Sequence, residues 1–296
     1  MVERKTVGST VFDVCNYIFL GLLALICFYP MWHVLCGSFS DPIELTKHYG
    51  PLMWLQGFSL EGYKVVLHNP NIGMGYLNTL FYVVVGTIAR MVFTLIGAYI
   101  LSRKGFMFRK VLTFCMVFTM YIGGGMIPTF LVVKAVGLYD SRAAIIIPSL
   151  ISTWNMIIMK TALQGVPASL EESARLDGAN DLVVLFRIII PVVKATVAVI
   201  CLYYAVAEWN SWFSAMIYLR DTSKRPLQVW LREILLQNSD NAGNNTGTVD
   251  ADVAALFLEE LVKYCTIMVA TVPILCIYPF VQKYFVTGVM MGSIKE

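Results

Sequence analysis

Six long apolar stretches restrict what this sequence can fold into. Each is long enough to cross the roughly 30 Å hydrocarbon core of a bilayer as an α-helix. Their approximate limits are 14–36, 76–101, 111–133, 143–163, 188–219 and 261–285. The chain is 58% hydrophobic and only 14% charged, whereas soluble domains carry about 25% charge. We therefore expect an all-α integral membrane protein in which residues 14–296 form one domain with six transmembrane helices.

The distribution of Lys and Arg predicts the orientation of these helices, because cytoplasmic connections carry an excess of positive charge. Four segments share one side of the membrane if six helices cross it: the N-terminus 1–13, the turn after the second span, the loop 166–187 and the C-terminal tail. Basic residues concentrate in them, namely Arg4, Lys5, Arg103, Lys104, Arg109, Lys110, Arg175, Arg187, Lys283 and Lys295. The bias is moderate. It predicts that both termini are cytoplasmic and that loops 37–75 and 220–260 are external.

Several functional classes find no support in the sequence. A net charge of +3 is too small to indicate nucleic-acid binding. The seven cysteines lie mostly in apolar runs without CxxC spacing, and the three histidines are not paired at metal-ligand spacing. The sequence lacks the phosphate loop G-x-x-x-x-G-K-[ST] and the metalloprotease motif H-E-x-x-H. We expect neither catalysis nor a metal on this chain, and we interpret the first apolar run as a retained anchor.

The loop 166–187 is charged and rich in residues that begin and end helices. Ser169 and Glu172 have capping-box spacing, Gly178 suits a turn with positive φ, and Asp181 is placed to cap a second helix. This pattern predicts a helix–turn–helix in water. An amphipathic helix on the membrane surface is the alternative, but the acidic balance disfavours anionic lipid and favours a groove in a soluble partner.

The same loop resembles a known signature, Glu-x-Ala, three residues, Gly, nine residues, Ile-x-Leu-Pro. The matching residues are Glu172, Ser173, Ala174, Gly178, Ile188, Ile190 and Pro191. Ser173 replaces the usual Ala and Ile190 the usual Leu, and both changes are mild. The loop is thus similar to the cytoplasmic coupling loop of an ATP-binding-cassette (ABC) importer permease. The segments SFSDPIELTK, GYLNTLFYVVVGT, PTFLVVKAVGLYDS, EWNSWFSAMIYL and KYFVTGVMMGS extend the resemblance to the second-subunit branch of the maltose-type carbohydrate permeases.

The resemblance implies a type I ABC importer permease fold in a bacterial cell membrane. It also implies a heterodimer with a second permease, two ATPase subunits that hold ATP and Mg²⁺, an extracellular solute-binding protein and a sugar substrate. The residues expected to couple to the ATPase are Glu171, Glu172, Ser173, Ala174, Asp177, Gly178, Ala179 and Pro191. The tail with Gly288, Gly292 and Ser293 is expected at the ATPase interface, unless it is merely frayed.

Three segments are candidates for the solute pathway or its gate. Glu208 is the clearest charge within a span, and Trp209, Asn210 and Trp212 beside it suit sugar binding. The alternative is an aromatic belt with Glu208 paired to a neighbouring helix. Glycines including Gly124, with Pro128, interrupt the third span, as a gating kink or for close helix packing. The Asn- and Gly-rich stretch 238–250 is expected to be mobile or turn-forming, either as a plain surface loop or in contact with the binding protein.

Three other interpretations remain possible at this level. A permease for a non-sugar solute fits the same motifs. A secondary transporter driven by an ion gradient predicts buried acids or histidines in several spans and inverted repeats, and we find neither. An intramembrane enzyme requires a catalytic constellation that the sequence does not contain.

Overall fold

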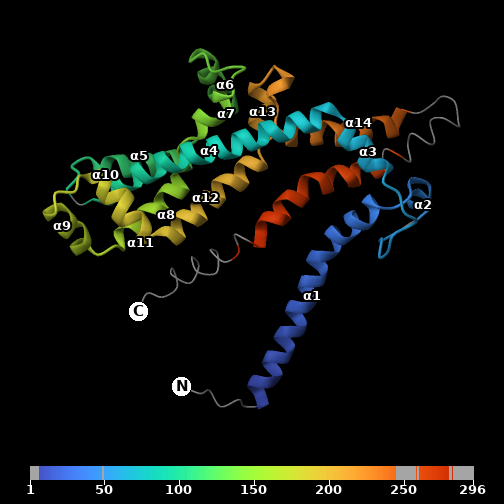
Figure 1. The fold of residues 1–296 in the computed structure, drawn as a ribbon, viewed down its shortest axis with the longest axis horizontal. Coiled ribbons are helices and arrows are strands. Elements are labelled where there is room, and N and C mark those ends of the chain that lie inside the picture. Colours follow the sequence, from blue (N-terminus) through green and yellow to red (C-terminus); the bar gives the residue numbers. More distant parts are fainter. Residues whose placement is uncertain are drawn as a thin grey trace. The chain divides into compact units, whose positions relative to one another are not determined.

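The computed structural model describes residues 7–48, 50–103, 105–244, 258, 260–279 and 282. Every regular element that it gives to these residues is a helix (Figure 1). Contacts divide the chain into two compact units, Met1–Asn69 with Leu231–Pro273, and Pro70–Trp230 with Ile274–Glu296. The longer helices are α1 Val7–Ser38, α4 Pro70–Ser102, α5 Arg109–Tyr121, α6 Met126–Ala135, α8 Thr153–Gln164, α9 Ala168–Leu176, α12 Lys194–Trp209, α14 Leu227–Asn244 and Glu260–Pro279. The short ones are α2 Pro42–Lys47, α3 Glu61–His68, α7 Ala143–Ile146, α10 Asp181–Val183, α11 Ile190–Val192 and α13 Phe213–Tyr218, with 3₁₀ turns Ile147–Ser149 and Thr222–Lys224 and a π-helical turn Val184–Ile189.

In the first unit, the end of α1 packs closely on helix Glu260–Pro279. A Cβ added to Gly37 would lie 2.9 Å from the Tyr264 ring, so only glycine permits this approach. The hydroxyl of Tyr63 donates to Ser38 Oγ at 2.9 Å, and Cys265 Sγ donates to the Ser38 carbonyl at 3.3 Å. The rest of α1 exposes its apolar side chains, and none of its most hydrophobic window is buried. Such a surface suits contact with lipid or another chain.

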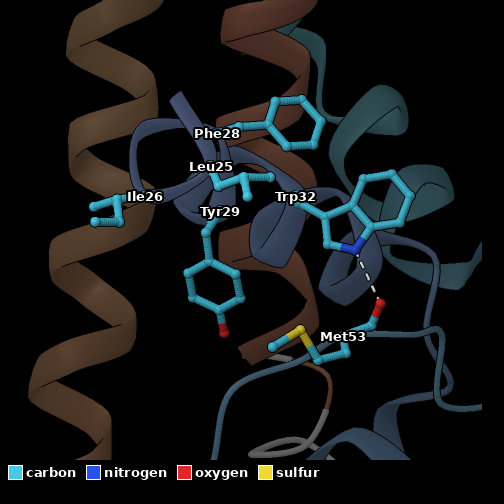
Figure 2. A pocket seen from close by; sticks show the side chains of 6 residues that line it. All are labelled: Leu25, Ile26, Phe28, Tyr29, Trp32 and Met53. Carbon is cyan, nitrogen blue, oxygen red and sulfur yellow. Dashed lines mark hydrogen bonds between the residues drawn. The ribbon is translucent and has the colours of Figure 1, made fainter. Parts of the chain in front are cut away.

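A groove lies along the exposed side of α1 (Figure 2). Its volume is about 530 Å³, and its lining residues are Leu25, Ile26, Phe28, Tyr29, Trp32 and Met53. The Trp32 indole N–H donates to the Met53 carbonyl at 2.9 Å, which fixes the loop after α2 against the helix. The groove is therefore mainly apolar, and the Trp32 indole N–H beside it has a hydrogen-bond partner.

The second unit is built around α4, which packs against both α8 and α12 (Figure 1). Its main core joins side chains from these three helices to the π-helical turn and to α9, namely Met91, Leu95, Ala98, Tyr99, Leu101, Met156, Met159, Leu163, Ala174, Val184, Leu185, Ile189, Val193, Ile200 and Tyr204. Two smaller clusters hold the opposite end, where α7 contacts α13. The α4 helix thus contacts the loop 166–187 at its C-terminal end and α7 nearer its N-terminal end.

Several of the apolar stretches are not single straight helices. Within the described ranges, three helices are long and apolar enough to cross a membrane: α1, α4 and Glu260–Pro279. Two bent helix pairs raise the number to five if each pair is one span, and their bends are 51° between α7 and α8 and 91° before α12. The third apolar stretch is interrupted at residues 122–125, between α5 and α6, where the sequence predicts a break.

The Asn- and Gly-rich stretch 238–250 differs in part from the prediction. The structure extends α14 to Asn244, so residues 238–244 are helical and not turn-forming. The buried side chains Leu227, Val229 and Leu231 fix the start of α14. Once a helix has started, each further residue gains one hydrogen bond, so the helix extends easily from this packed start. Residues 245–257 lie outside the described part.

Candidate functional site

The loop 166–187 forms the predicted helix–turn–helix, with α9 and α10 as its arms. Gly178 has φ +83°, as its position after the first helix predicts. The Ala179 N–H donates to the Ala174 carbonyl at 3.0 Å and the Gly178 N–H donates to the Arg175 carbonyl at 3.0 Å. These two bonds form a Schellman motif, which satisfies the last carbonyls of α9 and fixes the angle of the turn. We call this segment, residues 167–183, the hairpin.

The residues that begin the two arms are not those predicted. Pro167 stands at the N-cap of α9 without a side-chain bond, and Ser169 lies inside the helix, so the capping box does not form. Proline supplies a φ of −57° that already suits the helix start. Asn180 caps α10 by accepting from the Val183 N–H at 2.9 Å, and Asp181 is the first helical residue. The observed caps therefore lie two residues before Ser169 and one residue before Asp181.

The hairpin divides the predicted coupling residues into an inner and an outer set. Ala174 is only 6% exposed and belongs to the main core, and Ala179 is half-buried against the same core. Glu172, Ser173, Asp177 and Gly178 are exposed. Among the large apolar residues of the hairpin, Leu176 is 89% exposed and Leu182 is 60% exposed. The outer face therefore presents carboxylates beside exposed leucines. This combination favours binding in a groove of another protein over exposure to water.

Glu171 belongs to the inner set, although the sequence groups it with Glu172. Its carboxylate forms a salt bridge with Arg103, which follows the end of α4, and accepts from the Tyr99 hydroxyl at 3.3 Å. It also accepts from Arg175 at 3.1 Å, and Arg175 donates to Asp181 at 2.6 Å. The Arg103 guanidinium stacks over the Tyr99 ring at 4.3 Å, and burial lowers its pKa. One carboxylate thus joins α4 and α9 directly, and α10 through Arg175.

The second arm of the hairpin turns sharply before α12. The π-helical turn Val184–Ile189 precedes Pro191, which has no N–H and cannot join a regular helical ladder. The helical conformation stops at Val193, with φ −98° and ψ 20°, and α12 begins at Lys194 after a bend of 91°. The apolar stretch 188–219 is therefore not one straight helix, and α12 forms a single span with the segment before it only as a bent pair.

Glu208 forms a buried ion pair with Arg90 of α4. The distance between Arg90 Nη2 and Glu208 Oε1 is 2.5 Å, and the two side chains are 6% and 2% exposed. Arg90 Nη2 also donates to Ser149 Oγ at 2.6 Å, and a Cβ on Gly86 would touch the Glu208 carboxyl at 3.4 Å. The pair therefore joins α4, α12 and the turn before α8 in the middle of the unit.

The other residues of the Trp209–Trp212 segment point in different directions. Trp209 is buried, with its ring 6.3 Å from that of Tyr76. Its indole N–H is buried and has no hydrogen-bond partner among the described residues. Asn210 is exposed and its amide donates to the Val206 carbonyl at 3.0 Å, while Trp212 is half-buried against the Tyr82 cluster.

Gly124 and Pro128 lie at the interruption between α5 and α6. Both are exposed, and a Cβ on Gly124 would meet only Pro128 Cβ, at 3.9 Å. The positive φ of +83° falls on the next residue, Gly125, which caps α6. Close packing of these glycines against another described helix is therefore not observed. Gly288, Gly292 and Ser293 lie outside the described residues.

The sequence does not predict a role in the site for four residues that the structure places there: Arg90, Tyr99, Arg103 and Arg175. Arg90 carries a readable signal, because it lies inside the apolar stretch 76–101, where a charge is as expensive as Glu208 is in its own span. The other three are read only as topology signals or not at all. In the described ranges, no group of three or more His, Cys, Asp or Glu side chains is placed to hold a metal ion.

The described part of the chain, with helices as its only regular elements and an exposed hairpin between apolar helices, has the features of a transporter permease subunit. Residues 91–219 match the family "Binding-protein-dependent transport system inner membrane component". This range includes the hairpin and Glu208, and it begins one residue after Arg90. The chain is 41% identical over 287 residues to "Polygalacturonan/rhamnogalacturonan transport system permease protein YtcP" of Bacillus subtilis (strain 168), which covers 97% of this chain and 99% of that protein. It is 39% identical over 299 residues to "Protein LplC" of the same organism, over 100% of both chains.

A solved structure has the same fold. It is titled "Crystal structure of a bacterial ABC transporter involved in the import of the acidic polysaccharide alginate". The matched chain is 34% identical, has a TM-score of 0.84 and covers 96% of this chain and 100% of that one. The present chain therefore belongs to the inner-membrane components of binding-protein-dependent ABC importers, in their carbohydrate branch.

Proposed function

We propose that this chain is one half of a heterodimeric permease in a bacterial cell membrane. Six spans with both termini inside place the hairpin in the cytoplasm. Two ATPase subunits bind there, carry ATP and Mg²⁺, and drive alternating access, while an extracellular solute-binding protein delivers the solute. The family description and the basic residues of the expected inner segments support this arrangement.

One observation carries the proposal: the hairpin is anchored on one face and bare on the other. Ala174 and Glu171 fasten it to the core, and the Schellman turn at Gly178 fixes its two arms. Leu176 and Glu172 remain exposed on the outer face. A rigid element of this kind transmits a displacement from a partner groove into the helices behind it, which a flexible loop does not do.

We propose oligosaccharides as the substrate class, and uronate-containing ones in particular. The support comes from the names of two relatives, one for polygalacturonan and rhamnogalacturonan and one for the acidic polysaccharide alginate. In the proposed pathway, Asn210 and Trp212 are the side chains of their segment that a solute can reach. The interruption at Gly124 and Pro128 forms a flexible part of the pathway wall. Glu208 acts there by holding α12 on α4 through Arg90.

The test is co-purification from native membranes, followed by transport assays in proteoliposomes. The captured second permease, ATPase subunits and binding protein are reconstituted, and oligogalacturonides, neutral oligosaccharides and an amino acid are offered with ATP. The proposal predicts saturable uptake and stimulated ATP hydrolysis with an oligosaccharide, strongest with an acidic one.

Uptake of the amino acid alone would assign the chain to a non-sugar permease. Uptake of any solute that persists without ATP and collapses with the ion gradient would overturn the ABC assignment. Equal stimulation by neutral and acidic oligosaccharides would leave the carbohydrate proposal standing but reject the preference for uronates.

A further inference from the structure

The inner face of the hairpin contains a polar connection to α4 that the family signature does not include. Glu171 is the centre of this connection, which also contains Tyr99, Arg103, Arg175 and Asp181. We infer that Glu171 is a positioning residue that transmits displacement of the hairpin to α4, and that it does not contact the ATPase. The inference rests on the proposed function and adds the route by which the coupling reaches the pathway.

Burial separates Glu171 from its neighbour. The Glu171 side chain is 12% exposed, whereas Glu172 is an exposed residue. Three donors approach the Glu171 carboxylate, and two of them come from the end of α4. Three of the roughly four acceptor sites of this carboxylate are thus used inside its own chain, which leaves it little capacity to bind a partner.

The donors Tyr99, on α4, and Arg103, just after its end, are themselves held in place. The Arg103 guanidinium stacks on the Tyr99 ring, and Tyr99 is 7% exposed in the main core. A planar guanidinium that is stacked and paired at once resists both rotation and translation, more than a lysine at the same place would. Movement of α9 is therefore transmitted to α4 through Glu171, because the Arg103 side chain cannot absorb it by rotating.

The same helix carries Arg90 three to four turns earlier, in the ion pair with Glu208. A displacement that α9 gives to the end of α4 thus reaches the one buried charge pair that joins α4 to α12 in the described part of this unit. Packed helices have discrete arrangements and do not deform continuously, so a small shift at one end is carried along the rod.

The experiment uses the complete reconstituted transporter and compares Glu171→Gln with Glu172→Lys. Glu171→Gln keeps the side-chain volume and the acceptor for Tyr99 but removes the charge that holds Arg103. We expect ATPase subunits to stay bound and ATP hydrolysis to continue, while uptake per ATP falls about 2- to 30-fold, the range for positions within a coupling network. Glu44→Gln, which breaks an exposed ion pair with Lys47 on α2, is the matched control and leaves uptake per ATP unchanged.

A charge exchange identifies the pair. Arg103→Glu alone uncouples the transporter, and Arg103→Glu combined with Glu171→Arg restores uptake per ATP to within about threefold of the original, because the attraction is retained. Normal uptake per ATP in Glu171→Gln, or loss of ATPase binding in this variant, overturns the inference. If neither variant assembles, the network serves folding and the inference is equally overturned.

The outcome at Glu172 separates this inference from the proposed function. If Glu172→Lys weakens ATPase capture but Glu171→Gln is normal, the proposed function stands and only the route through Glu171 fails. If the unaltered complex captures no ATPase and imports without ATP, the proposed function itself fails.

Discussion

At the scale of single residues, the hairpin depends on one backbone conformation. Gly178 has φ +83°, and no atom lies within 4 Å of a Cβ built there, so a substitution is opposed by the backbone alone. Non-glycine residues lose about 1–2 kcal/mol in this region, although Asn tolerates it better than most. The turn therefore provides a clean measure of how much hairpin geometry matters for coupling.

Substitution of Gly178 should lower uptake per ATP in the order that backbone strain predicts. We expect Gly178→Asn to remain close to the original, Gly178→Ala to be impaired, and Gly178→Val to be the most impaired because β-branched residues are least suited to positive φ. Uptake and ATP hydrolysis in proteoliposomes measure this ratio. Equal values for the three variants would show that the turn does not control coupling.

A second prediction at this scale concerns the Arg90–Glu208 pair. Glu208→Gln and Arg90→Gln each leave a buried charge without its partner, which costs about 3–5 kcal/mol. The double variant leaves no isolated charge, so the thermal midpoint of the detergent-purified complex should recover most of what either single change loses. Strictly additive losses would refute the pairing as the main role of these side chains. If Glu208→Gln instead abolishes uptake at an unaltered midpoint, Glu208 contacts the solute.

At the scale of secondary-structure elements, α4 is the helix around which the second unit is organised. Two glycines on it make close approaches of different kinds. A Cβ at Gly75 would lie 3.0 Å from the backbone Cα of Leu227, whereas at Gly97 it would lie 2.7 Å from the flexible end of Met156. The nature of the neighbour, more than the shorter distance, decides which site tolerates a methyl group.

We therefore expect Gly75→Ala to be the more damaging of the two changes. It should destabilise by about 1–3 kcal/mol, the usual cost of overpacking, because the α14 backbone has to move. Gly97→Ala should cost less, because the Met156 methyl group can rotate away. Thermal unfolding of the two variants in detergent measures the order. A larger loss for Gly97→Ala would mean that α4 and α8 are packed more rigidly than these contacts indicate.

The bend before α12 yields another prediction at this scale. Pro191→Ala restores an N–H to the chain and removes the ring that disturbs the ladder before Val193. We expect the 91° bend to open and uptake per ATP to fall, while ATPase binding persists. Spin labels at exposed Leu182 and Lys194 measure the change across the bend. An unaltered label distance would show that packing of Val193 in the core, and not Pro191, maintains the bend.

The sequence anticipates local features of these elements better than long-range ones. Gly178 and the break at residues 122–125 follow from glycine, whose backbone freedom is visible in the sequence. The sequence does not identify the caps at Pro167 and Asn180, because Ser169 is a better side-chain cap than proline and Asp181 is as good a cap as Asn180. Arg90 lies 118 residues from Glu208 and Arg103 lies 68 residues from Glu171, so no local pattern identifies either ion pair.

At the scale of the whole molecule, the exposed surfaces call for partners of different kinds. The apolar length of α1 suits lipid or a second permease, and the outer face of the hairpin suits a soluble groove. The full-length likeness to importer permeases explains why one chain exposes both surfaces. The chain is therefore best understood as one subunit of a binding-protein-dependent importer, and the proposed function places the energy source on a partner ATPase.

Photocrosslinking from the hairpin in native membranes tests this account most directly. A crosslinking amino acid is placed at Leu176, the most exposed apolar residue of the hairpin, and a control is placed at exposed Glu44 on α2. The account predicts capture of a nucleotide-hydrolysing subunit from Leu176 and not from Glu44, with the yield changed by ATP. If Leu176 captures no such subunit while the transporter still imports its solute, the central claim is contradicted.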